Sequence, residues 1–310
     1  AAGGTLGILI PPSVALVIYA IVVEGSIIEM FQAAVLPGLL AVLFFIFIIW
    51  LRVHLNPDLA PKATILSDAE RKKALWRLLP VLLIFGAIIM GLGLGLFTPT
   101  PAAAMGVLVI LLYGFIARFF SQTHLTAQKL RNSVLSTAKT AGMIYLILFA
   151  ADVLKGFFAR SGLPVALTEL VANSSFDPYL ILVLMLILLI ILGCFMESLS
   201  MILVVVPFFW PTLIELNGGD YVAAADAAFG MTSEQLKIWF GILALVVVEL
   251  GLITPPVGLN VFVIKSFAPD TSMSTIFGGV MPFFAVEIFR VASILLFPAL
   301  CLFLPAYLSG

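Results

Sequence analysis

The stretch Gly251-Leu-Ile-Thr-Pro-Pro-Val-Gly-Leu-Asn260 decides the fold, because it interrupts an apolar sequence that otherwise favours helices. Pro255 and Pro256 remove two backbone donors and fix two φ angles, so an α-helix cannot continue through them. Thr254 precedes a proline and is therefore also disfavoured in the helical conformation. The flanking sequence on both sides is mostly apolar, which indicates that the break lies within a membrane. Non-helical backbone survives there only when it is buried in protein or lines a wet cavity.

The beginning of the chain repeats this pattern in Gly4-Thr-Leu-Gly-Ile-Leu-Ile-Pro-Pro-Ser13. There, too, a short apolar helix is followed by two prolines and a small polar residue. Interrupted helices in corresponding positions of two halves are the best sequence indication of the binding site in a transporter built from repeats. The simpler alternative is that each Pro-Pro pair only kinks a helix whose Ser and Thr hydroxyls bond back to it. The matched pair of breaks favours the first interpretation.

The composition excludes a soluble globular protein. Of the 310 residues, 63% are hydrophobic and only 10% are charged, whereas soluble domains carry about 25% charged residues. Apolar runs of about 20 residues recur along the chain, which is typical of an all-α polytopic membrane protein. The net charge of −1 offers no basic surface for nucleic acid. Cys194 and Cys301 lie in apolar runs without metal-ligand spacing, so we expect them to be small core residues.

Apolar runs separated by polar segments predict the order of the helices. The expected elements are interrupted helices at 3–23 and 236–267, spans at 30–51, 75–96, 102–119 and 138–158, a short helix at 163–172, and a short helix followed by a last span within 276–305. Ser67 and Glu70 form a capping-box pattern that opens a helix running into the span at 75–96. We expect a short amphipathic surface helix at 120–137. Because the chain begins almost at once in a broken helix, we also expect an N-terminal part to be missing.

The apolar tract 179–214 has two interpretations, because residues 193–200 interrupt it. It could form two full spans joined by a tight turn, or a re-entrant hairpin whose tip lies at Glu197 and Ser198. Each arm offers about 15 apolar residues, fewer than the roughly 20 that a full span needs. Pro207 also weakens the second arm as a regular helix. The hairpin is therefore the favoured interpretation.

Five regions follow from this reading of the chain. They are a broken helix plus one span at 1–52, a cytoplasmic linker at 53–74, two spans and the surface helix at 75–137, a broken helix, the hairpin tract and the second Pro-Pro broken helix at 138–267, and a C-terminal short helix and last span at 268–310. The segments 52–77 and 118–139 together hold ten of the fifteen Lys and Arg residues. The positive-inside rule places these segments in the cytoplasm, and the C-terminus then lies on the outer, periplasmic side.

The available chemistry lies mostly in the backbone of the broken helices, because no nucleophile–base pair, phosphate-binding loop or carboxylate cluster of an enzyme is present. A helix that ends inside the membrane exposes free carbonyls, and the next helix exposes free N–H groups. Carbonyl, hydroxyl and amide oxygens suit Na⁺, and the N–H end suits a carboxylate. The candidate substrate-binding and ion-binding residues are Gly7, Pro11, Pro12, Ser13, Glu197, Ser198, Ser200, Thr254, Pro255, Pro256, Gly258 and Asn260.

Two acidic residues lie close to these breaks. Glu197 is an intramembrane acid and thus a functional candidate, or else it lies near an interface or pairs with a buried cation. Glu249 lies about one turn before the second break and either faces the site or pairs with Lys237 or Arg290. We also expect the glycines Gly7, Gly251 and Gly258 to allow close approach of the backbone.

The order of these motifs resembles the large membrane subunit of TRAP transporters, the DctM-like permeases. The matching stretches are Gly4–Ser13, Gly95-Leu-Phe-Thr-Pro-Thr100, Gly193-Cys-Phe-Met-Glu197, Pro207 with Pro211, Gly251–Gly258, Met281-Pro-Phe-Phe284, Phe297-Pro298 and Leu304-Pro305. The resemblance covers essentially the whole chain and implies an elevator-type carrier with inverted repeats in the bacterial inner membrane. Such permeases take a carboxylate, such as a dicarboxylate, from a periplasmic binding protein and import it with Na⁺, together with a small four-helix membrane subunit.

Carried onto this chain, the resemblance makes 1–52 the end of the first inverted repeat, 75–137 scaffold-type spans of the second repeat, and 138–267 part of the transport domain. It also implies a Na⁺ site near Ser198, Thr254 and Gly258, with no cofactor other than the coupling ion. Two departures matter. Pro101 stands where the family usually has Glu after Thr-Pro-Thr, and the first hairpin expected before Gly3 is absent. We therefore expect that this chain alone does not transport. The alternative function is a membrane channel or scaffold subunit in which the breaks only shape a pore.

Overall fold

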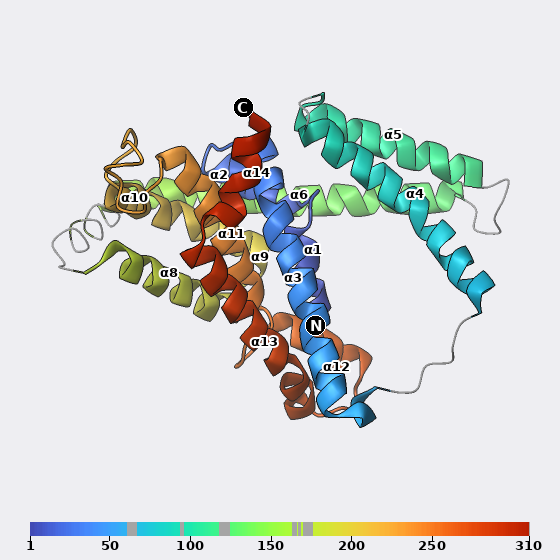
Figure 1. Cartoon of the computed structure of the whole chain (residues 1–310). Helices are drawn as coiled ribbons and strands as arrows, with labels where there is room; N and C mark the ends of the chain where they lie inside the picture. The colour runs from blue at the N-terminus through green and yellow to red at the C-terminus, as the bar shows by residue number, and fades with distance from the viewer. Residues whose placement is uncertain are drawn as a thin grey trace. The chain divides into compact units, whose positions relative to one another are not determined.

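The structure, a computed structural model, describes residues 1–60, 67–93, 96–117, 125–162 and 176–309, together with positions 166 and 169 (Figure 1). Throughout these residues the regular structure is helical, with no β-strand. The helices are α1 (Ala2–Leu9), α2 (Val14–Val22), α3 (Ile27–Leu55), α4 (Asp68–Gly93), α5 (Pro99–Ala117), α6 (Ala127–Ser161), α8 (Pro178–Gly193), α9 (Ser198–Val204), α10 (Val206–Asn217), α11 (Ser233–Gly251), α12 (Leu259–Phe267), α13 (Met273–Leu296) and α14 (Ala299–Ser309), with a 3-10 turn at Pro57–Leu59.

Many of these helices are long and apolar enough to cross a membrane. Within the described residues, five single helices meet that requirement, namely α3, α4, α5, α6 and α13. Two bent pairs, α1 with α2 and α9 with α10, bring the number to seven if each pair is one span. The all-α polytopic membrane fold expected from the apolar runs is thus confirmed.

Both predicted interrupted helices are present. The first consists of α1 and α2, which are bent by 53° across the Pro11–Pro12 break. The Ser13 hydroxyl caps α2 by accepting a hydrogen bond from the Leu16 amide at 3.4 Å. The second consists of α11 and α12, on either side of the Pro255–Pro256 break. Both Pro-Pro peptide bonds are cis.

The chain divides into two compact units, Ala1–Leu51 with Ile147–Gly310, and Arg52–Leu146. In the first unit, α11 lies at the centre and packs against α1, α2, α8, α9, α10, α13 and α14 (Figure 1). From Ile238 to Val248 its sequence is apolar on all faces, as expected of a helix surrounded by protein. Two polar side-chain atoms in this core bond to backbone carbonyls: Tyr19 Oη donates to Lys237 O at 2.8 Å, and Trp239 Nε1 donates to Ile294 O at 2.9 Å. These bonds fix α2 and α13 against the central helix.

The N-terminus of α11 carries a complete capping box. Thr232 Oγ1 accepts from the Gln235 amide at 3.4 Å, and Gln235 Oε1 accepts from the Thr232 amide at 3.0 Å. Replacement Thr232→Ala leaves an amide of the first turn without its acceptor, and we expect a loss of about 1 kcal/mol of stability. Thermal unfolding of the purified protein in detergent measures the loss as a lower midpoint. Ser274→Ala, at an exposed position on α13, is the control that we expect to leave the midpoint unchanged.

In the second unit, α4 packs against α5. The predicted capping box at its start is confirmed, since Glu70 Oε2 accepts from the Ser67 amide at 3.0 Å and Ser67 Oγ accepts from the Glu70 amide at 3.3 Å. The predicted run of this helix into a span is also confirmed. The separate surface helix expected at 120–137 is wrong for its described part, because α6 is one helix from Ala127 to Ser161. The first glycine in α6 is Gly142, and the helix holds no proline, so nothing in its sequence stops it near 137.

The C-terminal region also differs from the expected order. The long helix α13 comes first and the shorter α14 follows, whereas a short helix and then a span were expected. Pro282 lies inside α13 without ending it. Membrane helices tolerate an internal proline when neighbouring groups satisfy the freed backbone. Pro298 does separate the two helices. The short helix expected at 163–172 lies outside the described residues, apart from positions 166 and 169.

Candidate functional site

The tract 179–214 folds as two arms joined at the predicted tip. The first arm, α8, ends at Gly193, and the second begins at Ser198 with α9 and continues as α10. The second arm is bent by 50° between α9 and α10, directly before Pro207. This bend is where the proline was expected to weaken the helix. The first arm has 16 residues, so it is shorter than the roughly 20 residues of a full span.

Glu197 forms the cap of α9 at this tip. Its carboxylate accepts hydrogen bonds from the backbone amide of Ser200 at 3.3 Å and from the Ser200 hydroxyl at 3.4 Å. The Glu197 side chain is otherwise exposed. A carboxylate at this position satisfies an orphan amide and complements the helix dipole. The structure therefore gives Glu197 a structural role and shows it on the surface of the described unit.

Two glycines bring the tip against the second break. Gly193 ends α8 and Gly251 ends α11. A Cβ atom on Gly251 would lie 2.7 Å from Gly193 Cα and 2.9 Å from the Ile190 carbonyl oxygen. A Cβ on Gly193 would lie 3.1 Å from Gly251 Cα. The two helices thus cross with their backbones in contact, which only glycine permits at this distance. The expected close approach at Gly251 is confirmed.

The second break folds back on the end of α11. The Thr254 hydroxyl donates to the Leu250 carbonyl at 2.6 Å, and the Asn260 amide donates to the Leu252 carbonyl at 3.0 Å. Gly258 has a φ of 62° and opens α12. Cys194 Sγ on the hairpin tip lies 3.5 Å from the Pro255 carbonyl oxygen. Contacts from Gly193 and Cys194 therefore join the tip to the end of α11 and to the proline pair.

The third contact between tip and break is a buried polar pair. Ser198 Oγ donates to Glu249 Oε1 at 2.6 Å, and the two residues are 2% and 3% exposed. Sequence reasoning left the partner of Glu249 open, and the structure places it towards the hairpin. Lys237 is not its partner, because Lys237 pairs with Glu234 at 2.7 Å. The signal for Glu249 was present, since a carboxylate inside an apolar helix beside a break is a functional candidate by default.

The first break lies in the same unit but has different surroundings. Pro11 and Ser13 are buried, whereas Gly7 and Pro12 are exposed. A Cβ atom on Gly7 would meet nothing within 4 Å among the described residues, so the expected close backbone approach at Gly7 is wrong there. Helix α2 packs against α9 and α11, and α1 packs against α11 and α13. The helices of the first break and of the hairpin thus pack against the central helix, and the second break follows the end of that helix.

These contacts place the oxygen atoms of hydroxyl groups and of the Glu249 carboxylate at the junction. Within the described ranges, no three His, Cys, Asp or Glu side chains lie together as a metal site would require. A helix end offers unpaired carbonyls, and the Ser198 and Thr254 hydroxyls add side-chain oxygens. Such a donor set suits Na⁺ better than a transition metal. Thr254 and Asn260 are partly buried, and Ser200 is also partly buried at the tip.

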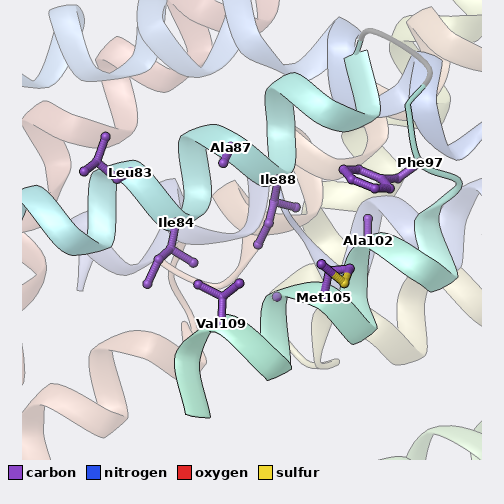
Figure 2. Close-up of a pocket in the computed structure, with 9 residues that line it drawn as sticks. Leu83, Ile84, Ala87, Ile88, Phe97, Ala102, Met105 and Val109 are labelled. Carbon is purple, nitrogen blue, oxygen red and sulfur yellow. The ribbon is translucent and has the colours of Figure 1, made fainter. Parts of the chain in front are cut away.

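A separate apolar cavity lies between α4 and α5 in the other unit. It has a volume of about 350 Å³ and is lined only by apolar residues. In Figure 2, Ile84 and Ile88 of α4 face Met105 and Val109 of α5, and Phe97 lies at one end. Because none of its lining residues has a polar side chain, this cavity offers no side chain that could orient an anion. It is therefore not a candidate for the site of an organic acid.

Comparison with known proteins gives a consistent result over almost the whole chain. Residues 1–300 match the family described as the DctM component of the tripartite ATP-independent periplasmic transporters. The chain is 32% identical over 308 residues to the C4-dicarboxylate TRAP transporter large permease protein of Pseudomonas aeruginosa, covering 99% of this chain and 66% of that protein. It is 32% identical over 314 residues to the sialic acid TRAP transporter large permease protein of Vibrio cholerae, covering 100% of this chain and 67% of that protein.

An isethionate TRAP transporter permease protein of Oleidesulfovibrio alaskensis is 27% identical over 272 residues, covering 86% of this chain and 39% of that protein. The chain thus spans about two thirds of the length of the large permease proteins that it matches.

Proposed function

This chain belongs to the DctM family of tripartite ATP-independent periplasmic transporter components, and on that premise we propose that it imports a small organic acid together with Na⁺. The family consists of transporters and not of enzymes. The matched relatives are named for C4-dicarboxylate, sialic acid and isethionate, which are all small organic anions. That shared chemistry supports an acid as the substrate class and leaves the particular acid open.

The observation that carries the proposal is the junction between the hairpin tip and the second break. Helix α8 meets α11 through Gly193 and Gly251, and Ser198 bonds to Glu249. A pair of broken elements held in contact is the arrangement in which transporters place coupling ions. We assign Na⁺ to oxygens of Ser198, Thr254 and Gly258. The acid would bind beside it at Ser200 and Asn260, with further contacts near Ser13 of the first break.

The proposed mechanism is of the elevator type. Residues 138–267 would move as the transport part, with the hairpin closing over the second break, while residues 75–137 would belong to the fixed scaffold. The protein would lie in the bacterial inner membrane with its C-terminus in the periplasm. Its partners would be a small four-helix membrane subunit and a periplasmic binding protein that delivers the acid. The description of matched relatives as tripartite components and large permease proteins supports such an assembly.

Uptake into proteoliposomes tests this function. The complete natural permease would be reconstituted with its small subunit, its binding protein and a radiolabelled acid that the binding protein retains. We expect saturable uptake that requires the binding protein and an inward Na⁺ gradient. Uptake at the same rate with and without the Na⁺ gradient would refute the coupling of acid import to Na⁺. Flux that does not saturate and needs no binding protein would support a channel instead.

Thr254 offers a matched pair of variants for the proposed ion site. Its hydroxyl hydrogen is used in the bond to Leu250 O, which leaves oxygen lone pairs for a cation. Thr254→Val keeps the shape but removes the oxygen, and we expect the Na⁺ concentration for half-maximal uptake to rise at least about fivefold, equivalent to about 1 kcal/mol. Thr254→Ser keeps the oxygen and should stay close to the unmodified protein. Equal half-saturation in both variants would remove Thr254 from the site.

A further inference from the structure

A buried network of charged groups lies behind the hairpin tip. Glu249 on α11 bonds to Ser198, and Glu287 and Arg290 on α13 form an ion pair. These three charged residues are each at most 3% exposed. The Glu249 carboxylate is attracted electrostatically to Arg290 and repelled by Glu287 and by Glu197 at the tip. Such a network is costly to bury, which makes a function for it a reasonable hypothesis.

The geometry of the Ser198 hydroxyl explains what Glu249 does. A serine hydroxyl has one hydrogen to donate and two lone pairs that accept. The carboxylate takes the hydrogen at 2.6 Å. Ser198 Oγ then presents only lone pairs to any group on its other side. A hydroxyl fixed in this way can bind a cation through its oxygen lone pairs.

Arg290 on α13 supplies a positive charge that attracts the Glu249 carboxylate. Within the part of the chain that the structure describes, Arg290 Nε and Nη1 and Glu287 Oε1 have no hydrogen-bond partner. The guanidinium therefore retains donors beyond those used by Glu287, and its positive charge attracts both carboxylates. On α13, Arg290 thus favours the charge on which the orientation of Ser198 depends, whereas Glu287 opposes it. Outer partners of this kind commonly change the affinity of a metal site by about 10–100-fold.

We propose that Glu249 is a positioning residue that orients the Ser198 hydroxyl as a cation ligand, with the positive charge of Arg290 on α13 supporting the Glu249 carboxylate. This inference rests on the proposed Na⁺-coupled function. It identifies a residue outside the Pro-Pro breaks that sets the affinity for Na⁺. Glu249 itself does not touch the ion or the acid. It acts through Ser198 at the hairpin tip.

The test is Na⁺-dependent uptake by Glu249→Gln in the reconstituted complete transporter. Glutamine keeps the volume of the side chain but is a weaker, neutral acceptor, and its amide can donate to Ser198 and occupy a lone pair. We expect the Na⁺ concentration for half-maximal uptake to rise about tenfold, with a much smaller change in the maximal rate at saturating Na⁺. Glu234→Gln is the matched control, because Glu234 lies on the same helix but is 69% exposed.

A double variant separates positioning from a general structural role. If Glu249 acts through Ser198, then Glu249→Gln should add little to the rise caused by Ser198→Ala, because contacting residues are not additive. Additive effects, or an unchanged half-saturation in Glu249→Gln, would overturn the inference. If Glu249→Gln does not fold, Ser198→Ala gives the first readout, and no rise in half-saturation there also overturns it. If uptake by the unmodified protein does not depend on Na⁺, the proposed function itself is refuted.

Discussion

Gly251→Val should abolish transport and strongly destabilise the protein. The new Cβ would lie 2.7 and 2.8 Å from two backbone atoms of Gly193 and 2.9 Å from the Ile190 carbonyl oxygen. Because all three neighbours are backbone atoms, no side-chain rotation can relieve the overlap, and α8 must move away from α11. Overpacking of this kind typically costs about 1–3 kcal/mol, and we expect the upper end. The measurements are the midpoint of thermal unfolding and the initial rate of acid uptake.

Gly279→Val is the control for this substitution. Gly279 lies on an exposed face of α13, and an added Cβ would meet nothing within 4 Å among the described residues. We expect its unfolding midpoint to match that of the unmodified protein or to rise slightly, since valine has a better helix propensity than glycine. If Gly251→Val unfolds at the same temperature as this control, the backbones of the hairpin and α11 are not in contact at Gly251.

Arg290→Met should destabilise the protein by about 3–5 kcal/mol, because it leaves buried carboxylates without their cation. Arg290 is 1% exposed and pairs with Glu287, which is 2% exposed. The measurement is again thermal unfolding of the purified protein in detergent, with a large fall in the midpoint expected.

The double variant Glu287→Leu with Arg290→Met is the decisive comparison. Replacing a buried ion pair by apolar residues of similar size is often neutral or stabilising. We therefore expect the double variant to recover most of the stability lost in Arg290→Met, although Glu249 still lacks its cation. A double variant that unfolds as early as Arg290→Met would show that burial of an unpaired charge is not the cause.

Local sequence rules predicted the interrupted helices and the hairpin tip. Pro11–Pro12 and Pro255–Pro256 stop a helix whatever surrounds them, and the Ser67–Glu70 capping box depends only on residues three apart. The buried free thiols of Cys194 and Cys301 were expected for the same reason, because both lie in apolar runs. The order of the two C-terminal helices was wrong, because the sequence does not show which proline ends a helix. Pro282 lies inside α13, whereas α13 ends shortly before Pro298.

Contacts between residues far apart in the chain could not be predicted from the sequence. Ser198 and Glu249 are separated by 51 positions, and spacing alone left open whether Glu249 faces the site or pairs with Lys237 or Arg290. The Gly193–Gly251 crossing likewise depends on how α8 and α11 pack in space. The membrane side of the C-terminus and the assigned ligands remain predictions, because they depend on the bilayer and on bound ions.

Na⁺-specific stabilisation of the purified complete permease tests the central claim most directly. A ligand that binds only the folded state at 100 times its dissociation constant adds about 2.7 kcal/mol of stability. We predict that NaCl raises the unfolding midpoint of the unmodified protein above its value in KCl at equal ionic strength. The difference should shrink strongly in Thr254→Val and persist in Thr254→Ser. Equal midpoints in NaCl and KCl for the unmodified protein, or an undiminished difference in Thr254→Val, would contradict a Na⁺ site at the junction of hairpin tip and broken helix.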